Sequence, residues 1–210
     1  VNHSALDMRI NNMDPVDRDG VPQARVDIHV DLIDYEFDIA HDFGPTDITV
    51  RNTHASAAPD LTLAGLIDNP LGYTVITNTS GSILSAGALG VVRSNRVLLE
   101  AGGNIGAWYP NQFGAPVDLP INVQLVESPG RATSLFATAG ASLYLDITGL
   151  QRTPGATAMT VRLDDLIAGS DLRLRLRESI LQTTIAGSFN FGLTVDMFHP
   201  SIGADPAAAD

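Results

Sequence analysis

The sequence predicts an all-β protein whose short strands stack as the coils of a parallel β-solenoid. Strand-like runs of alternating apolar and polar residues recur along the chain, and helical periodicity is rare. The turn-forming residues, among them 19 Gly and 12 Pro, are spread throughout the 210 residues. Segments of similar pattern also repeat at intervals of about 20 to 26 residues, which is the spacing that stacked coils require.

The first strand-like region contains a change of face. Every second residue of 26–32 is aliphatic, but after Ile33 the apolar positions shift by one, to Tyr35, Phe37 and Ile39. A one-residue slip moves side chains to the opposite face, so we expect a bulge or a corner near Ile33. The polar positions of both runs form an acidic row, which is either a solvated strand face or a cation or substrate face. They are Asp27, His29, Asp31, Asp34, Glu36 and Asp38.

Ten further strands follow the same alternation of apolar and polar residues. We expect them at 47–51, 61–64, 73–77, 90–93, 96–100, 121–126, 142–147, 159–163, 172–177 and 189–195.

Internal repeats supply the coil period. Residues 74–83 align without a gap on residues 96–105, at an offset of 22 residues. An earlier copy beginning at Ile48 has an offset of 26 and places Asn52 over Asn78, where an amide ladder is expected. Each coil would stack on the previous one at about 4.8 Å. Later copies of the repeat are expected to continue from Val97 to Val123, then to Leu143, then to Val161.

The alternative fold is a β-sandwich, or a jelly roll, of antiparallel strands. Strands of a sandwich need not resemble one another, so the gapless repeat favours the solenoid. Antiparallel neighbours for residues 73–77 and 96–100 would instead indicate the sandwich.

Three stretches resemble the repeats of filamentous-haemagglutinin-type large bacterial exoproteins. They are ITNTSGSIL (76–84), RSNRVLLEAGGNIGA (93–107) and PVDLPINVQLVES (116–128). The resemblance covers about residues 45–165 and implies a right-handed parallel β-helix, secretion, and a role in adhesion or as a spacer. It supplies no catalytic residues.

The expected organisation follows from the extent of these repeats. Residues 45–165 would form the solenoid, preceded by an acidic β segment or cap at 1–44. Irregular β coils are expected at 166–203 and a linker or tail at 204–210. We expect the chain to be a segment of a longer extracellular or cell-surface protein, with flanking repeats of the same polypeptide as neighbours.

Composition narrows the range of partners. The formal net charge is −12, and all 12 basic residues are arginine. Such an acidic chain repels phosphate backbones, so nucleic-acid binding is not expected. The absence of cysteine excludes disulfides and thiolate metal sites. No apolar stretch of about 20 residues is present, so no membrane span is expected.

One acidic loop is a candidate calcium site. Asp14, Asp17 and Asp19 precede Gly20, and oxygen ligands at this short spacing suit Ca²⁺. An ordinary acidic turn is the alternative interpretation. No other cofactor is expected.

Two segments are candidate ligand-binding sites. Trp108, Tyr109 and Phe113 gather aromatic rings in one turn, where they could stack on sugars, or the loop could fold back over the solenoid. Arg173, Arg175 and Arg177 lie on one side of a strand and could bind a sulfated or carboxylated glycan. Alternatively, the arginines pair with acidic residues of a neighbouring coil, namely Asp146, Asp164, Asp165 or Glu178.

Catalytic signatures are missing from the sequence. It contains no HExxH or GxSxG pattern, and the glycines at 102, 103 and 106 precede no helix. The prediction is therefore a non-enzymatic structural or adhesive segment whose partner is a host or matrix glycan or protein. A carbohydrate-active β-helix enzyme, either a polysaccharide lyase or a hydrolase, and a β-sandwich binding module are the alternatives.

Overall fold

The structure, a computed structural model, describes residues 8–12, 28–30, 33–34, 47–53, 60–109, 117–128, 130–152, 159–177, 180–189 and 193–198. Side-chain surroundings are described within 47–53, 60–108, 117–128, 130–152 and 159–177. This part of the chain contains strands and turns and no helix, which confirms the all-β prediction. The strands are β1 (Met8–Asn12), β2 (Ile28–Val30), β3 (Ile33–Asp34), β4 (Asp47–Asn52), β5 (Leu61–Leu63), β6 (Leu66–Asn78), β7 (Ile83–Ser85), β8 (Val91–Ala101), β9 (Ala107–Tyr109), β10 (Val117–Leu119), β11 (Ile121–Val126), β12 (Thr133–Ala139), β13 (Leu143–Leu150), β14 (Met159–Ala168), β15 (Leu172–Arg177), β16 (Ile180–Phe189) and β17 (Leu193–Phe198).

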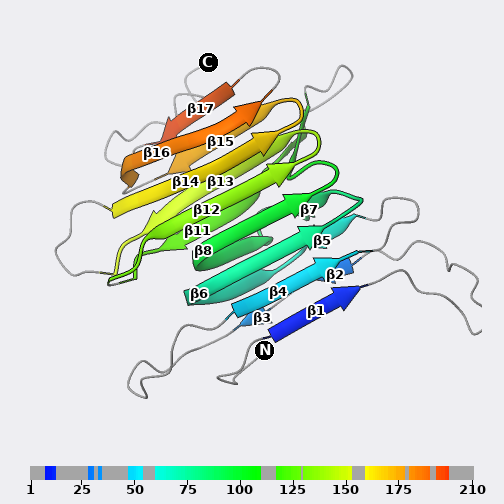
Figure 1. Ribbon diagram of the computed structural model, residues 1–210, viewed down its shortest axis with the longest axis horizontal. Helices are drawn as coiled ribbons and strands as arrows, with labels where there is room; N and C mark the ends of the chain where they lie inside the picture. Colours follow the sequence, from blue (N-terminus) through cyan, green and yellow to red (C-terminus); the bar gives the residue numbers. More distant parts are fainter. Residues whose placement is uncertain are drawn as a thin grey trace, which may run out of the picture.

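Parallel ladders stack these strands into a β-solenoid (Figure 1). One long ladder runs β1–β4–β6–β8–β12–β14–β16. A second runs β3–β6–β8–β11–β13–β15–β17. A short third ladder, β2–β5–β7, continues through bridges from Ile83 to Ile105 and from Ile105 to Leu143. The two halves of β6 and of β8 belong to different long ladders, so these strands bend around a corner of the coil.

This pairing decides between the two predicted folds. The segments 73–78 and 96–101 are parallel neighbours, so the β-sandwich alternative is wrong. The corner expected near Ile33 is confirmed, because β2 and β3 join different ladders. Parallel pairing also extends to both sides of residues 45–165, through β1 and β17.

The core is a stack of mainly aliphatic rows. Inward side chains alternate with outward ones along each strand, as in the buried-then-partly-exposed pattern of β15. One row places Val97 between Thr74 and Leu135, and the next places Leu99 between Ile76 and Ala137. Because every inner strand pairs on both edges, its backbone groups are satisfied and its inward positions can remain apolar.

The register corrects the sequence alignment by one residue. The turn matches at the expected offset of 22, since Ile83 bridges Ile105. The preceding strands pair at an offset of 23, with Thr74 opposite Val97. The two offsets differ because the turn after β6 holds one residue more than the turn after β8. With the gapless alignment, the inward Ile76 would have faced the outward Leu98.

The later repeat positions were also assigned wrongly. Val97 stacks on Leu135 rather than Val123, because β8 bends and its N-terminal half pairs with β11. Val123 stacks on Ile147 rather than Leu143. Leu143 faces Ile105 and Leu172, while Val161 faces Thr133.

Several strands were not expected from the sequence. They are β1, β7, β9, β10, β12 and β16. The strand expected at 189–195 is instead the end of β16 and the start of β17. The sequence pattern does not predict strand β12. The expected repeat therefore places β11 at the position on the first ladder that β12 occupies.

Candidate ligand-binding surfaces

The described ends of the aromatic segment form a β-hairpin that folds back over the outer face of β13 and β15. Strands β9 and β10 pair antiparallel, with Trp108 opposite Asp118. The hairpin is inserted between the core positions Ile105 and Ile121. Tyr109 belongs to β9, but its side chain lies outside the described part, as does all of Phe113.

The arginine row of β15 lies directly against this hairpin. The guanidinium of Arg173 stacks on the Trp108 ring, 3.5 Å from its centroid. Arg175 pairs with Asp118 at 3.3 Å and with Asp146 at 3.7 Å. The Nε of Arg177 donates to both carboxylate oxygens of Asp146, at 2.7 and 2.9 Å. The two candidate sites therefore form one surface, here called the hairpin–arginine surface.

Tyr144 completes the contacts beneath the hairpin. Its hydroxyl donates a hydrogen bond to an Asp118 carboxylate oxygen. Burial raises the pKa of Tyr144, and the hydrogen bond to Asp118 raises it further. The phenol therefore remains protonated and acts as a donor.

Most charges of the hairpin–arginine surface are satisfied internally. The side chain of Asp146 is only 8% exposed and serves both Arg175 and Arg177. Ion pairing with a neighbouring coil was the expected alternative, and it holds for Asp146. Asp164 instead pairs with Arg162, and Glu178 lies outside the described residues. A cavity of about 240 Å³ remains beside Trp108, lined also by Tyr144 and Arg173.

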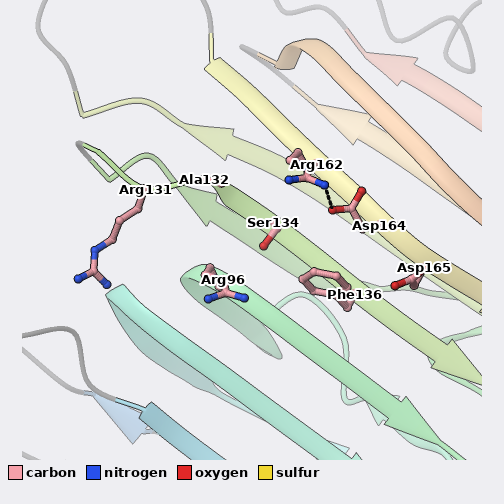
Figure 2. A pocket seen from close by; sticks show the side chains of 8 residues that line it. All are labelled: Arg96, Arg131, Ala132, Ser134, Phe136, Arg162, Asp164 and Asp165. Atoms are coloured by element: carbon pink, nitrogen blue, oxygen red, sulfur yellow. Dashed lines mark ion pairs between the residues drawn. The ribbon is translucent and has the colours of Figure 1, made fainter.

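A second surface was missed by sequence reasoning. Outward side chains of β8, β12 and β14 surround a hollow of about 530 Å³, here called the arginine groove (Figure 2). Its lining residues are Arg96, Arg131, Ala132, Ser134, Phe136, Arg162, Asp164 and Asp165. Arg96, Ser134 and Arg162 occupy one column of the ladder, at register positions far apart in sequence.

A β-bulge shapes one end of the groove. Phe136 faces Asp164 but Ala137 faces Leu166, so Asp165 is an extra residue in β14. Asp165 has a φ of 50°, which is uncommon for a residue other than glycine. The bulge lets the core alternation resume at Leu166 and places both Asp164 and Asp165 outside the core.

The charges of the groove are only partly matched. Arg162 pairs with Asp164 at 3.0 Å, and Arg96 stacks on Tyr73 at 4.9 Å from the ring centroid. Within the described part of the chain, the exposed side chains of Arg131 and Asp165 form no ion pair. A neighbouring hollow of about 500 Å³ shares Arg131 and Arg162 with the groove and so extends it.

The expected calcium site cannot be located, because Asp14, Asp17 and Asp19 lie outside the described residues. Elsewhere, in the residues that are described, no three His, Asp or Glu side chains gather in a way that could hold a metal ion. The same part of the chain has no helix of the length and apolarity needed to span a bilayer.

Comparisons with known protein families, curated proteins and solved structures found no match to this chain.

Proposed function

We propose that this chain is a structural and adhesive segment of a larger, secreted or surface-exposed bacterial protein. The observation that carries the proposal is the contrast between interior and exterior. The interior is filled with stacked aliphatic side chains, whereas hollows with arginine and aromatic side chains occur on the outside. Contact with a partner therefore belongs to the outward faces.

A solenoid suits this role physically. Its backbone ladders give a rigid frame on which outward residues vary without disturbing the core. The β9–β10 hairpin is such an addition, since it interrupts a coil without breaking the ladders on either side of it. The likeness of residues 76–128 to filamentous-haemagglutinin-type repeats also supports adhesion, with a host or matrix glycan or protein as the partner.

Bead adhesion tests the proposal. Microspheres coated with the full chain are washed over surfaces bearing dextran sulfate, polygalacturonate, dextran or fibronectin, and retained beads are counted. We expect more retention than for albumin-coated beads on at least one surface. Retention equal to that of albumin beads on all four surfaces would contradict the adhesive role.

A carbohydrate-active enzyme is the second candidate. The observation that favours it is the pair of carboxylates, Asp164 and Asp165, beside Arg162 in an open groove. Glycosidases use two carboxyl groups flanking the scissile bond. Incubation of the chain with polygalacturonate and with dextran, followed by measurement of new reducing ends, tests this candidate. A product yield that persists in Asp165→Asn would exclude Asp165 as one of the two groups.

A further inference from the structure

We infer that the arginine groove binds a linear anionic polysaccharide, whose carboxylate or sulfate groups contact Arg96, Arg131 and Arg162. This inference deepens the proposed adhesive function and rests on it. It assigns the ligand to the groove and not to the hairpin–arginine surface, where Asp118 and Asp146 already engage two of the three β15 arginines.

The ladder arranges cations along the stacking direction. Arg96 and Arg162 lie on either side of Ser134 in one column, so their backbones are two coil spacings apart, about 9.5 Å. A linear polysaccharide presents its anionic groups at a regular spacing along its length. A column of cations parallel to the coil axis can therefore contact successive sugars of one chain.

The available charge favours an anion at the end of the groove that carries Arg131. Figure 2 shows Arg131 at one end and Asp165 at the other, with Arg96, Ser134 and Arg162 between them. Arg131 has no ion pair within the described region, and the Arg96 guanidinium stacks on the ring of Tyr73 and forms no ion pair with a described residue. Guanidinium groups bind carboxylate and sulfate oxygens through paired N–H donors.

The remaining lining matches the neutral parts of a sugar. Ser134 lines the groove between the two arginines with a small, 4% exposed side chain that carries no charge. Phe136 is half-buried and offers an apolar ring surface beside it. Asp165 can accept hydrogen bonds from sugar hydroxyls. The hollow of about 530 Å³ is within the range of known small-molecule sites, about 300–1,000 Å³.

Direct binding tests the inference. The full chain is titrated onto immobilised polygalacturonate, dextran sulfate and neutral dextran by biolayer interferometry, at low and high salt. We expect binding to an anionic polymer that weakens with salt, and no comparable binding to dextran. The double variant Arg96→Gln/Arg131→Gln is expected to weaken binding roughly tenfold or more. Preference between the two anionic polymers identifies carboxylate or sulfate as the recognised group.

Arg51→Gln is the matched control. Arg51 is exposed on β4 of the same ladder and lies outside the groove lining. Arg51→Gln removes one positive charge, so it is compared with the single variants Arg96→Gln and Arg131→Gln. Thermal melting of each variant verifies that the fold is retained. If Arg51→Gln weakens binding to the anionic polymer equally, the effect comes from the overall charge of the protein and the groove assignment is wrong. Equal binding to dextran would also overturn the groove assignment.

The outcomes separate this inference from the proposed function. If the parent chain binds an anionic polymer and the double variant binds equally well, the assignment of the ligand to the arginine groove is wrong, while the adhesive role stands. If the chain binds neither polymer yet its beads adhere to fibronectin, the conclusion is the same. If the chain binds neither polymer and its beads adhere to none of the surfaces, both proposals fail.

Discussion

At the scale of single residues, the buried amide of Asn78 connects two coils and one turn. It accepts a hydrogen bond from Asn52 Nδ2 at 3.1 Å, which confirms the expected amide ladder. Its own Nδ2 donates to the Ser82 carbonyl at 2.8 Å. The backbone N–H of Gly81 also reaches its Oδ1, at 3.4 Å. Asn78 is fully buried, so these groups have no access to water as an alternative partner.

We expect Asn78→Ala to lower the free energy of unfolding by about 1–3 kcal/mol, because it leaves the amide of Asn52 and the Ser82 carbonyl without this partner. Urea unfolding followed by circular dichroism measures the change. The neighbouring Thr79→Ala alters an exposed side chain and should cost less than about 0.5 kcal/mol. Equal losses for the two variants would show that the amide ladder has no special importance.

Glycine is required where turns stack closely. A Cβ on Gly140 would lie 2.1 Å from the Gly102 carbonyl oxygen, and a Cβ on Gly169 would lie 2.0 Å from that of Gly140. The obstacle is backbone in both cases, so it cannot rotate away as a flexible side chain could. These positions therefore exclude any side chain for steric reasons, although neither has a positive φ.

Alkaline pH should weaken the contact between Tyr144 and Asp118. Burial and the hydrogen bond raise the pKa of Tyr144 above its ordinary value of 10.0. A raised folded-state pKa stabilises the fold fully below the unfolded-state value, and this contribution is lost as the pH rises above it. The parent chain should therefore melt at a higher temperature than Tyr144→Phe at pH 8. The gap between their melting temperatures should shrink from pH 10 upward, and a constant gap to pH 12 would contradict this account.

At the scale of strands, the register of β8 determines which of two adjacent leucines belongs to the core. Leu99 is fully buried between Ile76 and Ala137, whereas Leu98 is outward and only half-buried. The gapless sequence alignment had paired Leu98 with Ile76. The error arose because the alignment preserved turn residues while the strand register follows inward side chains.

Leucine truncation at these two positions tests the register. We expect Leu99→Ala to cost about 2–5 kcal/mol, because it leaves a cavity in the aliphatic stack. Leu98→Ala should cost about 1 kcal/mol, through lost contacts with its neighbours on the outer face. Urea unfolding compares the two variants. A larger loss for Leu98→Ala would mean that β8 is shifted by one residue.

The β9–β10 hairpin illustrates which features of a surface can be predicted from a local sequence pattern. The aromatic cluster and the arginine row were each identified as candidate sites from the sequence, but nothing in the sequence indicated that Arg173 covers Trp108. These two residues are 65 positions apart and belong to different coils. Their meeting depends on how many residues each intervening coil contains, and the hairpin itself lengthens one of them.

At the scale of the whole molecule, each coil contacts mainly the coils above and below it. Stability should then be a sum of local terms plus interfaces between neighbours. In one core row, Ile48 and Leu163 are four coil spacings apart, roughly 19 Å, whereas Val97 and Leu135 are direct neighbours.

Double-mutant cycles can detect this arrangement. The losses from Ile48→Ala and Leu163→Ala should add to within about 0.5 kcal/mol, because the two sites share no contacts. Val97→Ala and Leu135→Ala should deviate from additivity by about 0.5 kcal/mol or more, since they share one cavity. Urea unfolding of the single and double variants provides the comparison. Strong coupling between the distant pair would contradict nearest-neighbour stacking.

The sequence alone determined the type of structure that this chain forms. Alternating aliphatic positions, closely spaced turn residues and the copies at Ile48 and Thr74 were sufficient to predict stacked parallel coils. Only the tertiary structure decided which outward residues meet, and it placed Arg96 and Arg162 on either side of Ser134 and Trp108 under Arg173. The physical reason is that any aliphatic side chain can fill an inward position, so the pattern tolerates several registers. Turn length and the bulge at Asp165 select one of them, and the register then sets which charges lie together on the surface.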